Sequence, residues 1–263
     1  MKIIAPCMEC QKELGHPSFE PIFSDYYEEA VAYIECSRGH KSAVLLQSQK
    51  FEILLESAAN ALLEGYTIEA ASSLSAAYER FFEFSIKVFC KKNVITKQAL
   101  EETFKQVSKQ SERQIGGFLF LHLITFGSNY VLSKKIPELR NKVVHQGYIP
   151  TPEEVIAFGE QIYQEIYSIT QLLKSSMQSE MQQVIMDDLQ SKNEKIPPQT
   201  PRATSTGAMF FSLSMAEQKR DFHEALASYK DAKEMIFGSV PYMKLLNKAV
   251  SLYSTLRGAG YKP

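Results

Sequence analysis

The sequence predicts a mostly α protein with a small N-terminal unit of a different kind. Over about residues 45–180, apolar side chains recur at steps of three and four, which is the period of a helix face. Residues 1–44 lack this period and instead combine short apolar runs with two closely spaced pairs of metal-ligating residue types. A proline-rich polar stretch then separates the helical region from the C-terminus. We therefore expect an N-terminal unit over 1–44, a helical bundle over 45–189, a linker over 190–208 and a C-terminal helical segment over 209–263.

Composition and charge place the chain among ordinary soluble globular proteins. Hydrophobic residues make up 44% of the 263 residues, charged residues make up 22%, and the formal net charge is -1. A nearly neutral chain does not coat nucleic acid with its whole surface, although this charge is compatible with a local basic site. The sequence holds no run of about 18 apolar residues, and the N-terminus reaches its first cysteine too soon for a signal peptide. We expect a cytoplasmic protein with no membrane partner.

Four residues near the N-terminus have the types and the spacing of a zinc site. Cys7 and Cys10 form a C-x2-C pair, and Cys36 and His40 form a C-x3-H pair. Cysteines of a cytoplasmic protein are thiols or metal ligands rather than disulfides, and zinc binds four sulfur or nitrogen ligands in a tetrahedron. Such a closed set leaves no position for water, so we expect a structural zinc ion. Two alternatives stay open: the cysteines are scattered near a surface histidine, or His16 supplies the fourth ligand.

The residues around these pairs indicate strands that lead into tight turns. Residues 2–5 and 30–36 are short apolar runs typical of strands, and Pro6 and Gly39 suit turns. The stretch resembles a zinc ribbon over about the first 44 residues, from which it departs by using three cysteines and one histidine. The fourth cysteine, Cys90, stands alone in an apolar stretch and is interpreted as a small buried side chain.

The helical region divides into segments at its glycines, prolines and capping residues. Gly65 ends the first segment, and Thr67 caps the second. Thr151 begins the last long helix, because a proline at the first helical position and two acids in the first turn follow it. The expected helices cover about residues 45–62, 67–88 and 97–113, an apolar segment over 116–130, a segment after Pro137, and residues 152–181. Strand patterns are absent, so we expect an all-α bundle of about four or five helices.

The segment after Pro137 carries the sequence Arg-Asn-Lys-Val-Val-His, in which Arg140, Asn141 and His145 are the residues of interest. It matches the R-x4-6-H motif, with a polar residue after the arginine, of the HEPN domains of prokaryotic defence, toxin–antitoxin and RNA-processing proteins. The stretch over residues 69–79 is also similar to the second helix of that fold, because a stripe of small residues is followed by Glu79. The resemblance covers about residues 45–180.

This resemblance implies a metal-independent endoribonuclease of the defence or toxin type, which acts on RNA as a homodimer with one motif from each protomer facing the other. A regulatory protein partner that keeps the enzyme silent fits this class. The implied catalytic residues are Arg140, Asn141 and His145. Histidine moves protons near neutral pH, and the guanidinium of arginine holds two phosphate oxygens, so the residue types suit the reaction. Arg140 and His145 lie about 140° apart on an ideal helix, so their convergence needs a helix end, a bent turn or a second protomer.

A second interpretation keeps the fold and removes the catalysis. Arg140 then pairs with Glu138 or with an acid on another helix, and His145 caps the C-terminal end of its own helix. The protein is then a non-catalytic, HEPN-like adaptor or binding module with the same structural zinc ion. Glu79 fits both interpretations, either in an internal ion pair or as an acid near the motif.

The C-terminal segment has helical patterns over about residues 215–237 and 241–256. The first of these patterns has one apolar stripe, made of Phe222, Leu226, Tyr229 and Ile236. This stripe needs a surface to bury it, and the sequence leaves three candidates: the helical bundle, a dimer partner or a second protein.

Overall fold

The computed structural model describes residues 2–5, 7–15, 22–28, 30–107, 110–133, 135–215, 219, 221–236 and 238. The protein is mostly helical and has a small strand region near the N-terminus, as the sequence predicts. Two compact units share the chain: the first draws on residues 1–47, 189–207 and 230–263, and the second on residues 48–188 and 208–229. Within the described ranges, none of the helices combines the length and the apolar character needed to cross a membrane.

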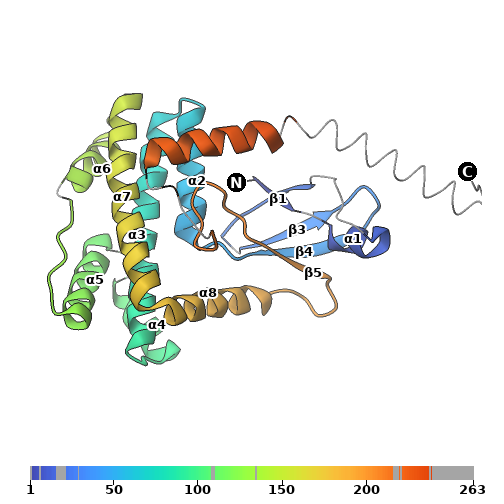
Figure 1. Ribbon diagram of the computed structural model, residues 1–263, viewed down its shortest axis with the longest axis horizontal. Helices are drawn as coiled ribbons and strands as arrows, with labels where there is room; N and C mark the ends of the chain where they lie inside the picture. Colours follow the sequence, from blue (N-terminus) through green and yellow to red (C-terminus); the bar gives the residue numbers. More distant parts are fainter. Residues whose placement is uncertain are drawn as a thin grey trace, which may run out of the picture. The chain divides into compact units, whose positions relative to one another are not determined.

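Short strands form the first unit (Figure 1). β1 (Lys2–Ala5) pairs antiparallel with β2 (Ile22–Asp25), and β3 (Val31–Glu35) pairs antiparallel with β4 (Lys41–Leu46). The helix α1 (Met8–Leu14) follows β1 and ends at Gly15. Both strands predicted from the sequence are therefore confirmed. β4 continues past the predicted end of the unit at residue 44, because its buried apolar run has no alternation that separates a strand from a helix start.

The segment predicted as a linker, residues 190–208, contributes a strand to this unit, so that prediction is wrong for its middle part. β5 (Arg202–Ser205) pairs in parallel with β4. Only Ala203 of its four side chains is buried, which explains the polar composition of a segment that backbone hydrogen bonds nevertheless order. Upstream of β5, Lys192 donates from Nζ to the carbonyl oxygen of Leu46 at 2.9 Å. These contacts join the segment to β4.

Helices form the body of the second unit, and α3 is its central element. The helices are α2 (Lys50–Leu63), α3 (Thr67–Lys92), α4 (Lys97–Val107), α5 (Ser111–Phe126), α6 (Lys135–Gln146) and α7 (Pro152–Ser176). α2, α5, α6 and α7 all pack against α3 (Figure 1). Thr151 caps α7 as predicted: its hydroxyl accepts from the N–H of Glu154, and the Glu154 carboxylate accepts from the N–H of Thr151.

Aromatic side chains fill the core of this unit. Phe51, Phe81, Phe82, Phe89 and Phe118 are fully buried. Phe82 and Phe118 meet edge to face with their ring centroids 4.9 Å apart, which joins α3 to α5. The regular apolar spacing that predicts the bundle therefore corresponds to its actual core.

Several helix ends differ from the predicted ones. α4 ends at Val107, before the predicted end at residue 113. α7 ends at Ser176, and α8 (Gln178–Asn193) follows after Met177, whose φ of -146° and ψ of 39° interrupt the helix. Met177 is itself buried in the core, so the apolar pattern runs on across the break and the sequence reads as one helix.

A helix over residues 222–236 begins in the second unit, and its residues up to Tyr229 pack back onto the bundle. Phe222 and Tyr229 are buried, and the Phe222 ring lies edge to face with Tyr163 of α7 and with Phe210, each at 5.8 Å between centroids. Among the three candidate surfaces, the bundle is the one that covers these two residues. The second predicted C-terminal helix, over residues 241–256, lies outside the described residues.

The approach of Phe222 to α7 requires a glycine. A Cβ atom at Gly159 would lie 2.6 Å from Cζ of Phe222, and the ring cannot move aside because Tyr163 and Phe210 flank it. We expect Gly159→Ala to lower the melting temperature, because overpacking costs about 1–3 kcal/mol and outweighs a helix-propensity gain of about 1 kcal/mol. Gly116→Ala is the matched control, since nothing lies within 4 Å of its Cβ position, and it should raise the melting temperature. A Gly159→Ala protein at least as stable as the wild type would contradict this packing.

Candidate functional site

Two turns in the first unit bring the four predicted metal ligands together. Cys7 is the N-cap of α1, where its Sγ accepts a hydrogen bond from the backbone N–H of Cys10 at 3.5 Å. Cys36 follows β3 and opens a turn, in which the N–H of Gly39 donates to the Cys36 carbonyl oxygen at 2.9 Å. Gly39 has a φ of 81°, a left-handed conformation that favours glycine. His40 comes next, directly before β4, so each pair lies at the end of a regular element.

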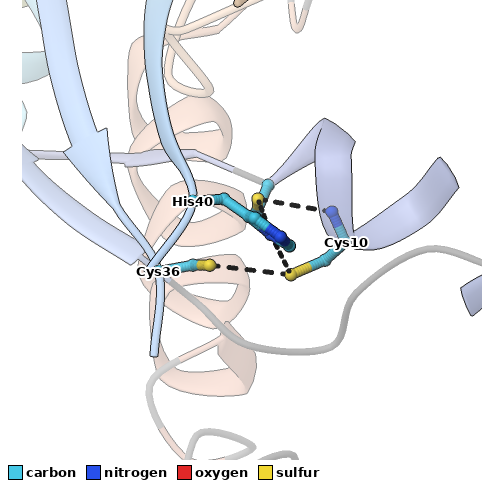
Figure 2. A group of neighbouring side chains, drawn as sticks. Cys10, Cys36 and His40 are labelled. Carbon is cyan, nitrogen blue, oxygen red and sulfur yellow. Dashed lines mark hydrogen bonds between the residues drawn. The ribbon is translucent and has the colours of Figure 1, made fainter. Parts of the chain in front are cut away.

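The side chains of Cys10, Cys36 and His40 point toward one another (Figure 2), and Cys7 completes the cluster. Cys10 Sγ lies 3.4 Å from His40 Nδ1 and 3.6 Å from Cys36 Sγ. Cys7 Sγ lies 3.8 Å from His40 Nδ1, and all four ligand atoms lie within 4.8 Å of one another. A tetrahedral zinc ion with bonds of about 2.0–2.3 Å holds its ligand atoms about 3.4–3.8 Å apart. The cluster therefore has the size and the donor set that zinc requires.

Burial and crowding shift the pKa values of the cysteines in the cluster. The three cysteines are buried and His40 is half-buried. Burial, together with the hydrogen bonds and charges of Cys36 and Cys7, raises the pKa of the Cys10 thiol to about 12. Burial acts to raise the pKa of Cys36 as well, but backbone hydrogen bonds from His40 and Arg38 lower it. Crowded sulfur atoms lose their protons together when a bound metal ion balances their charge.

A carboxylate that the sequence alone does not single out lies on the other side of the histidine ring. Glu13, from the last turn of α1, has its Oε1 3.0 Å from Nε2 of His40. Its Oε2 lies 2.8 Å from Nη2 of Arg38. The one signal in the sequence is its position three residues after Cys10, which puts both on one face of a helix. His16, the competing fourth ligand, lies outside the described residues.

In the second unit, α6 carries Arg140, Asn141 and His145, and their side chains meet. Arg140 Nη1 lies 3.0 Å from Asn141 Oδ1 and 3.0 Å from His145 Nε2. His145 is in the last turn of α6, before Gly147 with its φ of 67°, and the long arginine side chain reaches along the helix to it. The length of the arginine side chain is therefore what brings the two groups together along α6, and a single chain is sufficient for their contact.

Arg140 also joins α6 to the centre of the bundle. Its Nη2 lies 3.1 Å from Oε1 of Glu79 on α3, and Arg80 Nη2 lies 4.0 Å from the other oxygen of Glu79. The acid on another helix that the sequence leaves as an alternative is therefore Glu79. Both partners are partly exposed, with 24% of each side chain accessible, so the pair is not closed off from solvent.

The contact between Arg140 and His145 defines the state of the imidazole ring. A guanidinium group has only donors, so Nε2 of His145 is the acceptor and the ring carries its proton on Nδ1. This neutral ring is the form that can take up a proton. His145, in the last turn of α6, and Asn141 are both exposed to solvent.

Glu165 of α7 anchors the chain just before α6. The N–H of Ser133 donates to Glu165 Oε1 at 2.6 Å, and the Tyr78 hydroxyl donates to Oε2. Burial raises the pKa of Glu165, and these two hydrogen bonds act in the opposite direction. The Ser133 hydroxyl in turn accepts from the N–H of Lys135 at 3.3 Å. The first turn of α6 is thus fixed to α3 and α7, which sets the position of the motif.

No protein-family model matches the chain, and neither the curated proteins nor the solved structures contain a significantly similar one. The four favoured metal ligands and the three residues of the R-x4-H motif nevertheless lie in the two clusters described above.

Proposed function

We propose that the second unit is a metal-independent endoribonuclease of the HEPN type, and that the first unit is a zinc ribbon held by one structural zinc ion. The contact between Arg140 and His145 carries the ribonuclease proposal, because it joins a phosphate-binding group to a proton-transfer group at an exposed helix end. A role in defence or as a toxin, with a regulatory protein partner that keeps the nuclease silent, fits this activity.

The reaction begins when a phosphate of the RNA replaces His145 at the guanidinium of Arg140. The freed Nε2 of His145 takes the proton of the ribose 2′-hydroxyl, whose oxygen attacks the adjacent phosphorus atom. The bond to the 5′-oxygen breaks, which leaves a 2′,3′-cyclic phosphate on one product and a 5′-hydroxyl on the other. Arg140 stabilises the charge that develops on the phosphate oxygens, and Asn141 orients the phosphate.

A second protomer would supply the proton donor that this reaction needs. The 5′-oxygen leaves more readily when an acid protonates it, and one motif offers one histidine. A homodimer with two His145 rings around one phosphate provides both the base and the acid. The site is therefore complete only when two copies of the chain meet.

An exposed apolar face of α5 suits the contact between two copies. Phe120, Leu123 and Ile124 are 69%, 44% and 71% exposed, although they are large and hydrophobic. The stretch over residues 115–126 contains no Asp, Glu, Lys or Arg. An uncharged apolar face is complementary to itself, which a two-fold interface requires. α5 and α6 both pack on α3, so this face belongs to the same unit as the motif.

We expect the wild-type chain to be a dimer at micromolar concentration and Ile124→Glu to be a monomer, because two carboxylates would meet in an apolar interface. Light scattering during gel filtration measures both masses. Met186→Glu is the matched control, since Met186 is 60% exposed on α8, and it should leave the dimer intact. A strictly monomeric wild-type chain would remove the basis of the composite site.

Incubation of a defined RNA with the wild-type chain, in the absence of magnesium, tests the ribonuclease proposal. We expect products that end in a 2′,3′-cyclic phosphate or in the 3′-phosphate formed from it. A single 2′-deoxyribose at a cleavage position should protect that position, because the nucleophile is missing. RNA that stays intact with micromolar dimer would count against the proposal.

The ion pair between Arg140 and Glu79 favours a second candidate, a non-catalytic adaptor or binding module. In that case Arg140 serves to join α6 to α3, and the zinc ribbon and the C-terminal segment bind partners. The Glu79→Gln variant separates the two functions. If the protein is an adaptor, Glu79→Gln lowers its stability, and neither the wild type nor the variant cleaves RNA. If the protein is a nuclease, the cleavage rate of the variant changes because Arg140 loses its ion pair with Glu79.

A further inference from the structure

We infer that Glu13 is a positioning residue of the metal centre: its carboxylate orients the His40 ring so that Nδ1, and not Nε2, binds the metal. The inference rests on the proposed zinc ion and adds a residue outside the four ligands. Nδ1 of His40 lies 3.4 Å from Cys10 Sγ and 3.8 Å from Cys7 Sγ. Nε2 lies instead 3.0 Å from Oε1 of Glu13. The two ring nitrogens thus have different partners.

The chemistry of these partners assigns the proton. A neutral imidazole has one N–H donor and one lone pair, and an ionised carboxylate only accepts hydrogen bonds. The proton of His40 therefore lies on Nε2, where Glu13 accepts it, and the lone pair lies on Nδ1, where the sulfur atoms converge. A carboxylate at this place also makes the ring a stronger ligand and keeps it from rotating.

The carboxylate is itself held in place. Oε2 of Glu13 lies 2.8 Å from Nη2 of Arg38, which stands between Cys36 and His40 in the chain. The side chains of Glu13 and Arg38 are 45% and 47% exposed, and such an ion pair contributes little to stability by itself. We expect the ion pair to act on zinc affinity instead, because Arg38 fixes the position of the Glu13 carboxylate that orients His40. Glu13 is not a fifth ligand, since its nearer oxygen lies beyond Nε2, on the side of the ring away from the sulfur atoms.

Competition for zinc between the full chain and a chromophoric chelator measures the effect. We expect Glu13→Ala to bind zinc about 10- to 100-fold more weakly than the wild type. Glu13→Gln keeps an acceptor and loses the charge, so its loss should be smaller. Glu9→Ala is the matched control, because Glu9 lies on the same helix and pairs with Lys12 at 2.7 Å. This control should bind zinc with wild-type affinity.

Nitrogen NMR of the zinc-loaded chain gives a readout that a purely structural role of Glu13 would not change. In the wild type, His40 should show a metal-bound Nδ1 and a protonated Nε2, and in Glu13→Ala the Nε2 proton should exchange with water faster. Zinc binding through Nε2, or wild-type affinity in Glu13→Ala, would overturn the inference while the zinc proposal stands. A folded wild-type chain that binds no zinc would overturn both.

Discussion

Replacing His145 by alanine is expected to slow RNA cleavage at least about a hundredfold, because the 2′-hydroxyl then has no base to accept its proton. His145 is exposed at the end of α6 and donates no hydrogen bond into the core through Nε2, which faces Arg140. The fold should therefore survive the substitution, and the melting temperature should stay close to that of the wild type. Arg140→Lys should also impair cleavage, since a point charge does not replace the planar fork of the guanidinium.

Two controls make this result specific. His223→Ala removes another exposed histidine, on the helix over residues 222–236, and should cut RNA at the wild-type rate. Magnesium has to be depleted without a strong chelator, because loss of zinc from the first unit would imitate a catalytic metal requirement. A folded, dimeric His145→Ala protein that cuts RNA at the wild-type rate would show that the proposed mechanism is wrong.

The metal cluster could be predicted because its information is local. Cys7 and Cys10 belong to one turn, Cys36 and His40 to another, and the spacing within each pair sets the distance between its two side chains. Only the meeting of the two turns depends on the rest of the unit. The preference of zinc for four ligands predicts that the two turns meet, because one pair alone supplies only two ligands.

The outer contacts of both clusters could not be predicted in the same way. Glu13 meets His40, and Glu79 meets Arg140, through distances that the packing of separate elements determines. The spacing of residues in the sequence does not indicate such pairs. For Arg140 the sequence leaves an acid on another helix as a possible partner, and only the family resemblance suggests Glu79 as an acid near the motif.

The sequence predicts the helices, but it does not predict where they break. The apolar period reports which face of a helix is buried, and it continues across Met177 because that residue is buried too. β5 shows the converse case, since its side chains are mostly polar while its backbone pairs with β4. Side-chain patterns report burial, whereas backbone pairing at an exposed edge leaves little trace in them.

The second large effect is expected from the loss of one metal ligand. Cys10 is the central one, because its Sγ lies within 3.6 Å of both Cys36 Sγ and His40 Nδ1. A serine hydroxyl is a poor replacement for a thiolate ligand, so Cys10→Ser should weaken zinc binding by more than the roughly 10- to 100-fold expected for an outer carboxylate. The free energy of binding a structural zinc ion is also free energy of folding. The first unit should therefore become sensitive to trypsin at Lys12 and Arg38.

Cys90→Ser is the control with the same chemical change. Cys90 is a half-buried residue of α3 in the second unit and is not one of the four clustered ligands, and burial alone raises its pKa. Elemental analysis should find one zinc ion per chain in the wild type and in Cys90→Ser, and much less in Cys10→Ser. A small unit buries little of its surface and often depends on a metal ion for its stability, so the first unit should lose much of its stability with the ion. A Cys10→Ser protein that keeps one tightly bound zinc ion and wild-type resistance to trypsin would show that these four residues do not form a structural zinc site.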